Sequence, residues 1–118
     1  MSNSSVKKLS SNLKFVYSDN NSISVIFQNN DLLMGVVGEF NSNLKELEKL
    51  TNSTIYFRGN SILIKNGSGK NEIVKNAIQF LAEQFINNGS IEKKDIFSSI
   101  NKFMIKETII SLIKILNI

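Results

Sequence analysis

The most suggestive chemical motif in this chain is the short run Gly67-Ser68-Gly69-Lys70. Glycines let backbone N–H groups surround a phosphate, and a following lysine neutralises its charge. A phosphate-binding loop of this type needs glycine where Ile64 stands and serine or threonine where Asn71 stands, so we interpret the run as a connection between a strand and a helix. Glu46 and Glu48 form no catalytic pair, because residues two apart on a helix point in different directions, and both are expected to be solvated.

The composition excludes several classes of reaction. The 118 residues include no cysteine and no histidine, which excludes thiol and imidazole nucleophiles, disulfides and the zinc sites built from these residues. Apolar residues make up 42% of the chain and charged residues 20%, as in a globular domain. We therefore expect one small domain with no catalytic residue, no metal site and no cofactor of its own, and not an enzyme.

The charge balance permits an acidic partner without requiring one. Fourteen Lys and Arg residues against ten Asp and Glu residues give a net charge of +4, and Arg58 is the only arginine. Residues 1–22 contain no apolar run of signal-peptide length. The apolar segment at residues 105–118 is interrupted by Lys106, Glu107 and Lys114 and is too short to span a bilayer. We expect no membrane contact and a cytoplasmic location.

The periodicity of the apolar residues predicts an α+β domain at residues 23–88, between a flexible leader at 1–22 and a C-terminal helical extension at 89–118. Alternation predicts strands at residues 22–27, 53–58 and 61–65. Apolar residues three or four apart predict helices at residues 32–37, 44–50, 70–87, 91–100 and about 106–116.

Small and polar residues mark the ends of these elements. Gly59-Asn60 suits a tight hairpin between two strands. Residues 41–43 and Ser90 are typical caps for the helices that follow them. The last predicted helix is apolar on more than one face, so it needs a partner surface.

The order strand, helix, glycine-containing loop, helix, hairpin, helix resembles the βααββα order of a type I KH domain. The resemblance implies a three-stranded antiparallel sheet packed on helices, with additional C-terminal helices here. Gly38-Glu39-Phe40-Asn41 stands where KH domains have a G-x-x-G loop that clamps the nucleotide backbone. Asn41 replaces the second glycine and Glu39 adds a negative charge, so the implied clamp is weak.

A narrower resemblance joins several spaced matches between about residues 23 and 100. The chain is similar to the N-terminal KH-like domain of PhoH-like proteins at Phe27, Asn29-Asn30, Leu32-Leu33, Gly38-Glu39, Asn43-Leu44, Glu48, Arg58-Gly59-Asn60, Ile62 and Ile64. In that family this domain precedes a P-loop ATPase domain, and the family is linked to phosphate starvation and to suspected RNA metabolism. The Walker motifs are not in this chain, so the resemblance implies ATP and Mg²⁺ only for the ATPase domain, and we expect a fragment or a truncated protein.

The resemblance implies an accessory domain that binds single-stranded RNA or another nucleic acid weakly. The residues expected to bind it are Gly38, Glu39, Phe40, Asn41, Lys45, Arg58 and Asn60. Phe40 could stack on a base, or it could pack on Leu44 and Leu47 as a hydrophobic staple, which we favour. Arg58-Gly59-Asn60 could contact phosphate, or it could serve only the turn, in which Gly59 supplies a positive φ; we favour the turn.

The alternative is a protein-interaction module whose loop has lost nucleic-acid binding. The apolar final helix would then bury its surface against another copy of the chain or against the ATPase domain. The residues expected at this contact are Ile109, Leu112, Ile113 and Leu116.

Overall fold

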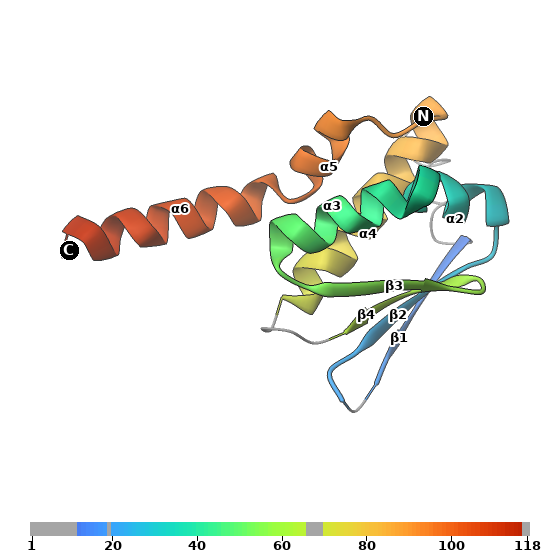
Figure 1. Cartoon of the computed structure of the whole chain (residues 1–118), viewed down its shortest axis with the longest axis horizontal. Coiled ribbons are helices and arrows are strands. Elements are labelled where there is room, and N and C mark those ends of the chain that lie inside the picture. Colours follow the sequence, from blue (N-terminus) through green and yellow to red (C-terminus); the bar gives the residue numbers. More distant parts are fainter. Residues whose placement is uncertain (1–11, 19, 66–69, 117–118) are drawn as a thin grey trace.

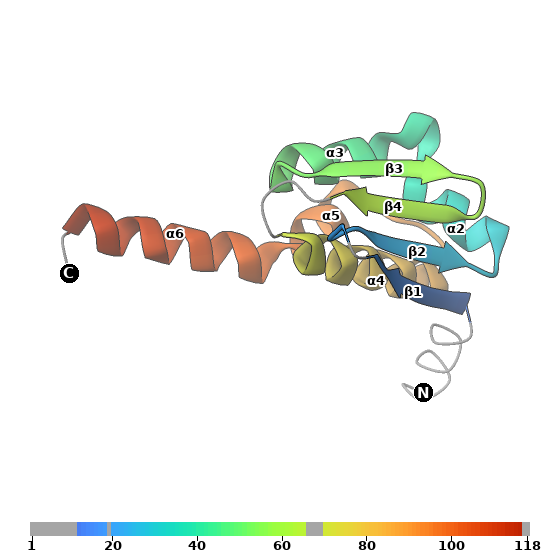
Figure 2. The same cartoon turned by 90° about the horizontal axis from the view of Figure 1, so that it is seen from below.

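The computed structural model describes residues 12–18, 20–65 and 70–116 and places helices over one face of an antiparallel sheet (Figure 1, Figure 2). The sheet has four strands in the order β1-β2-β4-β3: β1 (Leu13–Tyr17), β2 (Ile23–Phe27), β3 (Thr54–Arg58) and β4 (Ser61–Lys65). This arrangement confirms the expected α+β class. The expectation of three strands was wrong.

The helices occur along the chain in the predicted order, between and after the strands. They are α2 (Asn30–Val37), the 3-10 turn η1 (Glu39–Asn41), α3 (Ser42–Thr51), α4 (Asn71–Asn88), α5 (Lys93–Ser99) and α6 (Asn101–Leu116). α2, α3 and α4 cover the sheet and α5 packs on α3 and α4, whereas α6 projects from the body as a separate arm (Figure 1). None of the helices in the described ranges is long and apolar enough to cross a membrane.

Alternation along the strands places one set of side chains against the helices. Val25 pairs with Ile62, and Ile62 pairs with Phe57 on its other side. Val25 and Ile62 are fully buried, as is Leu81 of α4, and Phe57 packs at the margin of this core. Period-two alternation fixes which face of the hairpin meets the helices, because one side of each strand is apolar.

The additional strand, β1, lies in the segment expected to be a flexible leader. It pairs along its whole length with β2, from Leu13 opposite Phe27 to Tyr17 opposite Ile23. Leu13 is buried and Phe15 packs at the edge of the core. β1 thereby satisfies backbone groups that β2 would otherwise present as an open sheet edge. The leader expectation was wrong for residues 13–17, and its first eleven residues lie outside the described ranges.

Lys75 of α4 holds β1 from the helical side. Its Nζ lies 4.9 Å from the centre of the Phe15 ring and donates a 3.3 Å hydrogen bond to the Tyr17 hydroxyl. It also forms a 3.5 Å ion pair with Glu72. Desolvation lowers the pKa of Lys75, but the hydrogen bond to Tyr17 and the attraction of Glu72 outweigh it, so the pKa is raised overall.

Glu48 joins α3 to the edge strand β3. Its Oε2 accepts a 2.9 Å hydrogen bond from the backbone N–H of Ile55, so the expectation that Glu48 is simply solvated was wrong. Ile55 is paired with Ile64 of β4, and its N–H points to the outer edge of the sheet, where Glu48 supplies the acceptor that a further strand would otherwise provide.

Replacing Glu48 by alanine is therefore expected to lower the free energy of unfolding by about 1 to 2 kcal/mol, because a charge-assisted hydrogen bond to the backbone is lost. Urea denaturation followed by circular dichroism measures this change. Glu46→Ala, on the same helix, is the matched control and should shift stability by less than about 0.5 kcal/mol. Equal losses in the two variants would contradict the role assigned to Glu48.

The C-terminal helices begin at other residues than predicted. Glu92, not Ser90, caps α5: its side chain accepts from the Asp95 backbone, and its own N–H donates to Asp95 Oδ2 at 2.8 Å. This reciprocal pair forms a capping box, which Ser90 lies too far upstream to make. Ile96 and Ile100 are buried, and α6 starts at Asn101, five residues before the predicted start.

Candidate nucleic-acid interface

The predicted binding loop connects α2 to α3 and begins with a glycine in an unusual conformation. Asn29 caps the start of α2 by accepting the Leu32 N–H at 3.1 Å. At the other end, the Gly38 N–H donates to the Met34 carbonyl at 3.0 Å, and Gly38 has φ 82° and ψ 165°. Only glycine adopts this region readily. Gly38 thus ends α2 and turns the chain sharply into η1.

Asn43 holds the two sides of the loop together. Its Nδ2 donates to the carbonyls of Val36 at 3.2 Å and Gly35 at 3.4 Å, which satisfies acceptors at the end of α2. The prediction that residues 41–43 cap α3 with their side chains was wrong: Asn41 stands at the cap position in the left-handed conformation and makes no side-chain cap bond. The Ser42 N–H, the first of α3, donates to the Glu39 carbonyl, and the N–H groups that follow receive no side-chain cap from Asn41.

Phe40 lies at the outer surface of the loop. It adopts a left-handed conformation, with φ 56° and ψ 32°, and 86% of its surface is exposed. The favoured expectation of a hydrophobic staple was wrong, since Leu44 and Leu47 are buried without it. A left-handed backbone is costly for a bulky residue, and here it directs an aromatic ring into water, where it is accessible to a ligand.

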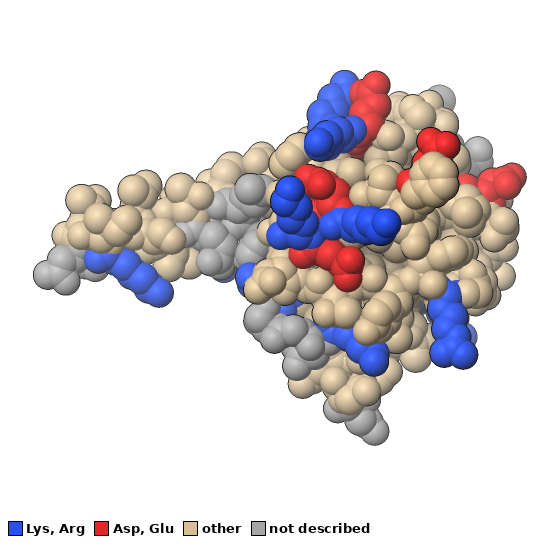
Figure 3. Space-filling model, viewed as in Figure 1, with Lys and Arg blue, Asp and Glu red and all other residues tan. Residues whose placement is uncertain are grey.

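Charged side chains of both signs surround this loop. Glu39 and Lys45 are exposed, the first in η1 and the second in the first turn of α3. Figure 3 shows acidic and basic side chains intermixed over the helical layer. The loop therefore lacks a uniformly positive surface, and Glu39 opposes the approach of a phosphate.

Arg58 and Asn60 lie at the β3–β4 turn. Gly59 has φ 61°, which confirms the predicted role of glycine there. The Asn60 carbonyl accepts the N–H of Phe27 at 2.9 Å, so the turn is fixed to the end of β2. Arg58 is exposed. This turn and the loop from Gly38 to Asn41 lie at the same end of the molecule, one in the sheet and the other in the helical layer (Figure 1, Figure 2).

The sheet face opposite the helices carries three cations, of which only Arg58 was among the predicted binding residues. Lys14, Arg58 and Lys65 alternate with the inward-facing residues of β1, β3 and β4 and are exposed. Lys65 Nζ lies 5.3 Å from the centre of the Tyr56 ring. Figure 3 shows Lys and Arg without Asp or Glu around the lower part of the molecule, where the sheet lies. Lys14 was missed because its strand was assigned to the leader.

The residues predicted for a contact with another chain are all exposed on α6. The exposed fractions are 51% for Ile109, 51% for Leu112, 42% for Ile113 and 63% for Leu116. They lie on the projecting arm, far from the loop at Gly38 (Figure 2). The structure thus separates the two sets of predicted residues instead of joining them in one site.

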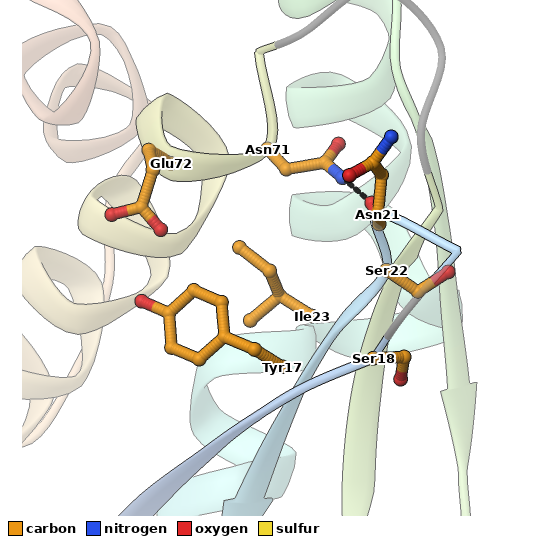
Figure 4. Close-up of a pocket in the computed structure, with 7 residues that line it drawn as sticks. All are labelled: Tyr17, Ser18, Asn21, Ser22, Ile23, Asn71 and Glu72. Carbon is orange, nitrogen blue, oxygen red and sulfur yellow. Dashed lines mark hydrogen bonds between the residues drawn. The ribbon is translucent and has the colours of Figure 1, made fainter.

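A cavity of about 450 Å³ lies where the β1–β2 turn meets the start of α4. Figure 4 shows Asn71 and Asn21 facing each other across it, and the Asn71 amide donates to the Asn21 carbonyl. This bond ties the turn to the helix, while Asn71 Oδ1 is buried with no hydrogen-bond partner among the described residues. None of the predicted binding residues lines the cavity.

The described residues also include no group of three or more side chains suited to hold a metal ion. Gly67-Ser68-Gly69 lies outside the described ranges.

Comparisons with known proteins give no support for any family. No protein-family model matches the chain, and neither curated proteins nor solved structures give a match. The function therefore has to be argued from the loop, the sheet and the α6 arm themselves.

Proposed function

We propose that this chain is a KH-like domain that binds single-stranded RNA weakly through the loop between α2 and α3. The order β2, α2, α3, β3, β4, α4 supports this proposal, as does the position of β4 between β2 and β3. On this interpretation β1, α5 and α6 are additions to the KH-like unit. The order of elements shared with KH domains supports the fold alone. The proposed RNA binding is therefore argued from the loop between α2 and α3.

The observation that carries the proposal is the exposed aromatic ring of Phe40 on a sharply turned loop. Backbone N–H groups at the start of α3 lie beside it, and such groups attract phosphate oxygens. An exposed ring next to phosphate-binding groups suits a single strand, whose bases can leave the stack and lie on an aromatic side chain. Phe40 thus supplies stacking, and the loop backbone supplies the phosphate contact.

A single strand bound to the loop would continue toward the β3–β4 turn. The loop and that turn lie at the same end of the molecule (Figure 2), and β3 is the outermost strand on that side of the sheet. Lys45 would neutralise a phosphate near the loop and Arg58 one near the turn. Because Glu39 lies within the loop and Asn41 replaces a glycine, the affinity is weak, and it falls only gradually as salt rises because just two cations contact phosphates.

The domain would act as an accessory unit, as in PhoH-like proteins. It would position RNA for a P-loop ATPase domain that this chain does not contain, and ATP and Mg²⁺ would bind to that domain alone. RNA handling of this kind is consistent with a cytoplasmic location. The proposal assigns no catalytic step to the residues of this chain.

Phe40→Ala is expected to weaken binding of single-stranded RNA by roughly 5- to 150-fold, because base stacking on an aromatic side chain contributes about 1 to 3 kcal/mol. The stability of the fold should be unchanged, since the ring is exposed. The measurement is fluorescence anisotropy of a labelled oligonucleotide at low and near-physiological salt. Equal affinities of the variant and the unmodified chain at both salt concentrations would rule out the loop as the binding site.

Lys45→Glu in the same titration separates phosphate contact from stacking. It should weaken binding and flatten the salt dependence, because one phosphate contact is lost. Lys49→Glu is the matched control, since Lys49 is also exposed on α3 but lies one turn farther from the loop. Similar losses in the two lysine variants would indicate attraction by overall charge alone.

A further inference from the structure

The α6 arm exposes more large apolar side chains than the rest of the described surface. Ile105, Ile109 and Leu112 each expose 51% of their surface, and Leu116 exposes 63%. Figure 3 shows few charged side chains on the visible side of the arm, and Figures 1 and 2 show that α6 extends away from the sheet and its helices. Contiguous apolar surface of this kind marks a contact with another molecule.

We propose that α6 pairs in antiparallel orientation with α6 of a second copy of this chain. Ile105, Ile109, Leu112 and Leu116 follow one another at intervals of four, three and four residues. This spacing is that of the a and d positions of a heptad, which form one apolar stripe along a helix and interlock with the same stripe of a partner. Ile113 borders the stripe and widens it. The stripe is therefore complementary to itself.

The exposed area agrees with a contact between two copies. Each side chain of the stripe exposes about half of its surface or more, and the stripe is only twelve residues long, so a pair would have a small interface of the kind that forms weak or transient contacts. An interface of this size predicts a dimer that dissociates on dilution. The stripe carries no charged side chain, so a charged partner surface would find no opposite charge on it. A second apolar stripe needs none.

The position of the body favours the antiparallel orientation. The body adjoins the first turn of α6, and the arm projects past it (Figure 1). In a parallel pair the two bodies would meet beside the same end of the paired helices. In an antiparallel pair Ile105 lies opposite Leu116 of the second copy, and the two bodies lie at opposite ends. Lys106 then lies beside apolar residues instead of beside Lys106 of the second copy. The opposed helix dipoles add a small favourable term.

Sedimentation over a range of concentrations tests the pairing. The chain should form a dimer that dissociates on dilution. Leu112→Glu should raise the dissociation constant by roughly 100-fold or more, because an unpaired carboxylate would have to leave water. Ser111→Glu is the matched control: it adds the same charge to α6 outside the stripe and should remain dimeric. A monomer throughout, an assembly larger than two copies, or equal effects of the two variants would overturn the proposal.

Cysteine substitutions test the orientation, because the chain contains no cysteine of its own. A mixture of the Ile105→Cys and Leu116→Cys variants should form a disulfide between the two different chains under mild oxidation. Neither variant alone should cross-link, because in an antiparallel pair the like positions are about 16 Å apart along the axis, beyond the reach of a disulfide. Cross-linking of either variant with itself would indicate a parallel pair and overturn the antiparallel arrangement. Both tests are independent of RNA binding, so they can fail while the proposed function stands.

Discussion

Replacing Gly38 by alanine is expected to lower the free energy of unfolding by about 1 to 3 kcal/mol and to weaken RNA binding at the same time. Gly38 occupies a region of backbone conformation, φ 82° and ψ 165°, that side chains disfavour strongly. A Cβ at this position would also lie 2.7 Å from Cγ and Nδ2 of Asn43, which bridges the loop to the end of α2. The substitution therefore disturbs both the backbone and the hydrogen bonds that shape the loop. Urea denaturation and the RNA titration measure the two effects.

Gly59→Ala separates backbone strain from contact. Gly59 also has a positive φ, 61°, but an added Cβ would have nothing within 4 Å. Its replacement should cost only the left-handed strain, about 1 kcal/mol, and leave the loop at Gly38 intact. If Gly38→Ala were as stable as the unmodified chain, the described turn between α2 and α3 would be incorrect.

Ile62→Ala is expected to have the largest effect on stability, a loss of about 2 to 5 kcal/mol. Ile62 lies on β4, between β2 and β3, and its side chain is fully buried against the helical layer. Its truncation removes apolar contacts and leaves a cavity that the paired strands on both sides cannot close. Ile62→Val, which removes a single methyl group, should cost about 0.5 to 1.5 kcal/mol at the same site. Thermal and urea unfolding give both values.

Leu63→Ala provides the control for the assigned sheet face. Leu63 is the next residue on β4, and its side chain lies half-buried on the opposite face, away from the helices. Its truncation should cost less than about 1.5 kcal/mol, because less surface is returned to water. A larger loss for Leu63→Ala than for Ile62→Ala would show that the strand is shifted by one residue, since such a shift exchanges the two faces.

Local pattern determines much of this protein. Alternation at Ile23, Val25 and Phe27 predicted β2, and the three-residue spacing of Leu44, Leu47 and Leu50 predicted α3. The turn at Gly59 follows from the need for a positive φ between two short strands. These features depend on residues within a few positions of one another, so the order of the elements could be predicted from the sequence.

Three features depend on contacts between segments far apart in the chain. β1 forms because β2 offers an edge and Lys75 packs on Phe15, although its apolar run by itself is short. Glu48 looked like a solvated helix residue because its hydrogen-bond donor, Ile55, belongs to another element. Phe40 is exposed because Leu44 and Leu47 are buried in the core without it. Periodicity alone could not show which residues cover these two leucines.

The sequence by itself determined the α+β class, the central strand–helix–helix–strand–strand–helix order and the apolar excess of the last helix. The tertiary structure decided that the sheet has a fourth strand, that the loop at Gly38 presents an aromatic ring, and that α6 stands apart from the core. The physical reason is that period and propensity are local, whereas pairing, burial and exposure depend on which distant surfaces meet.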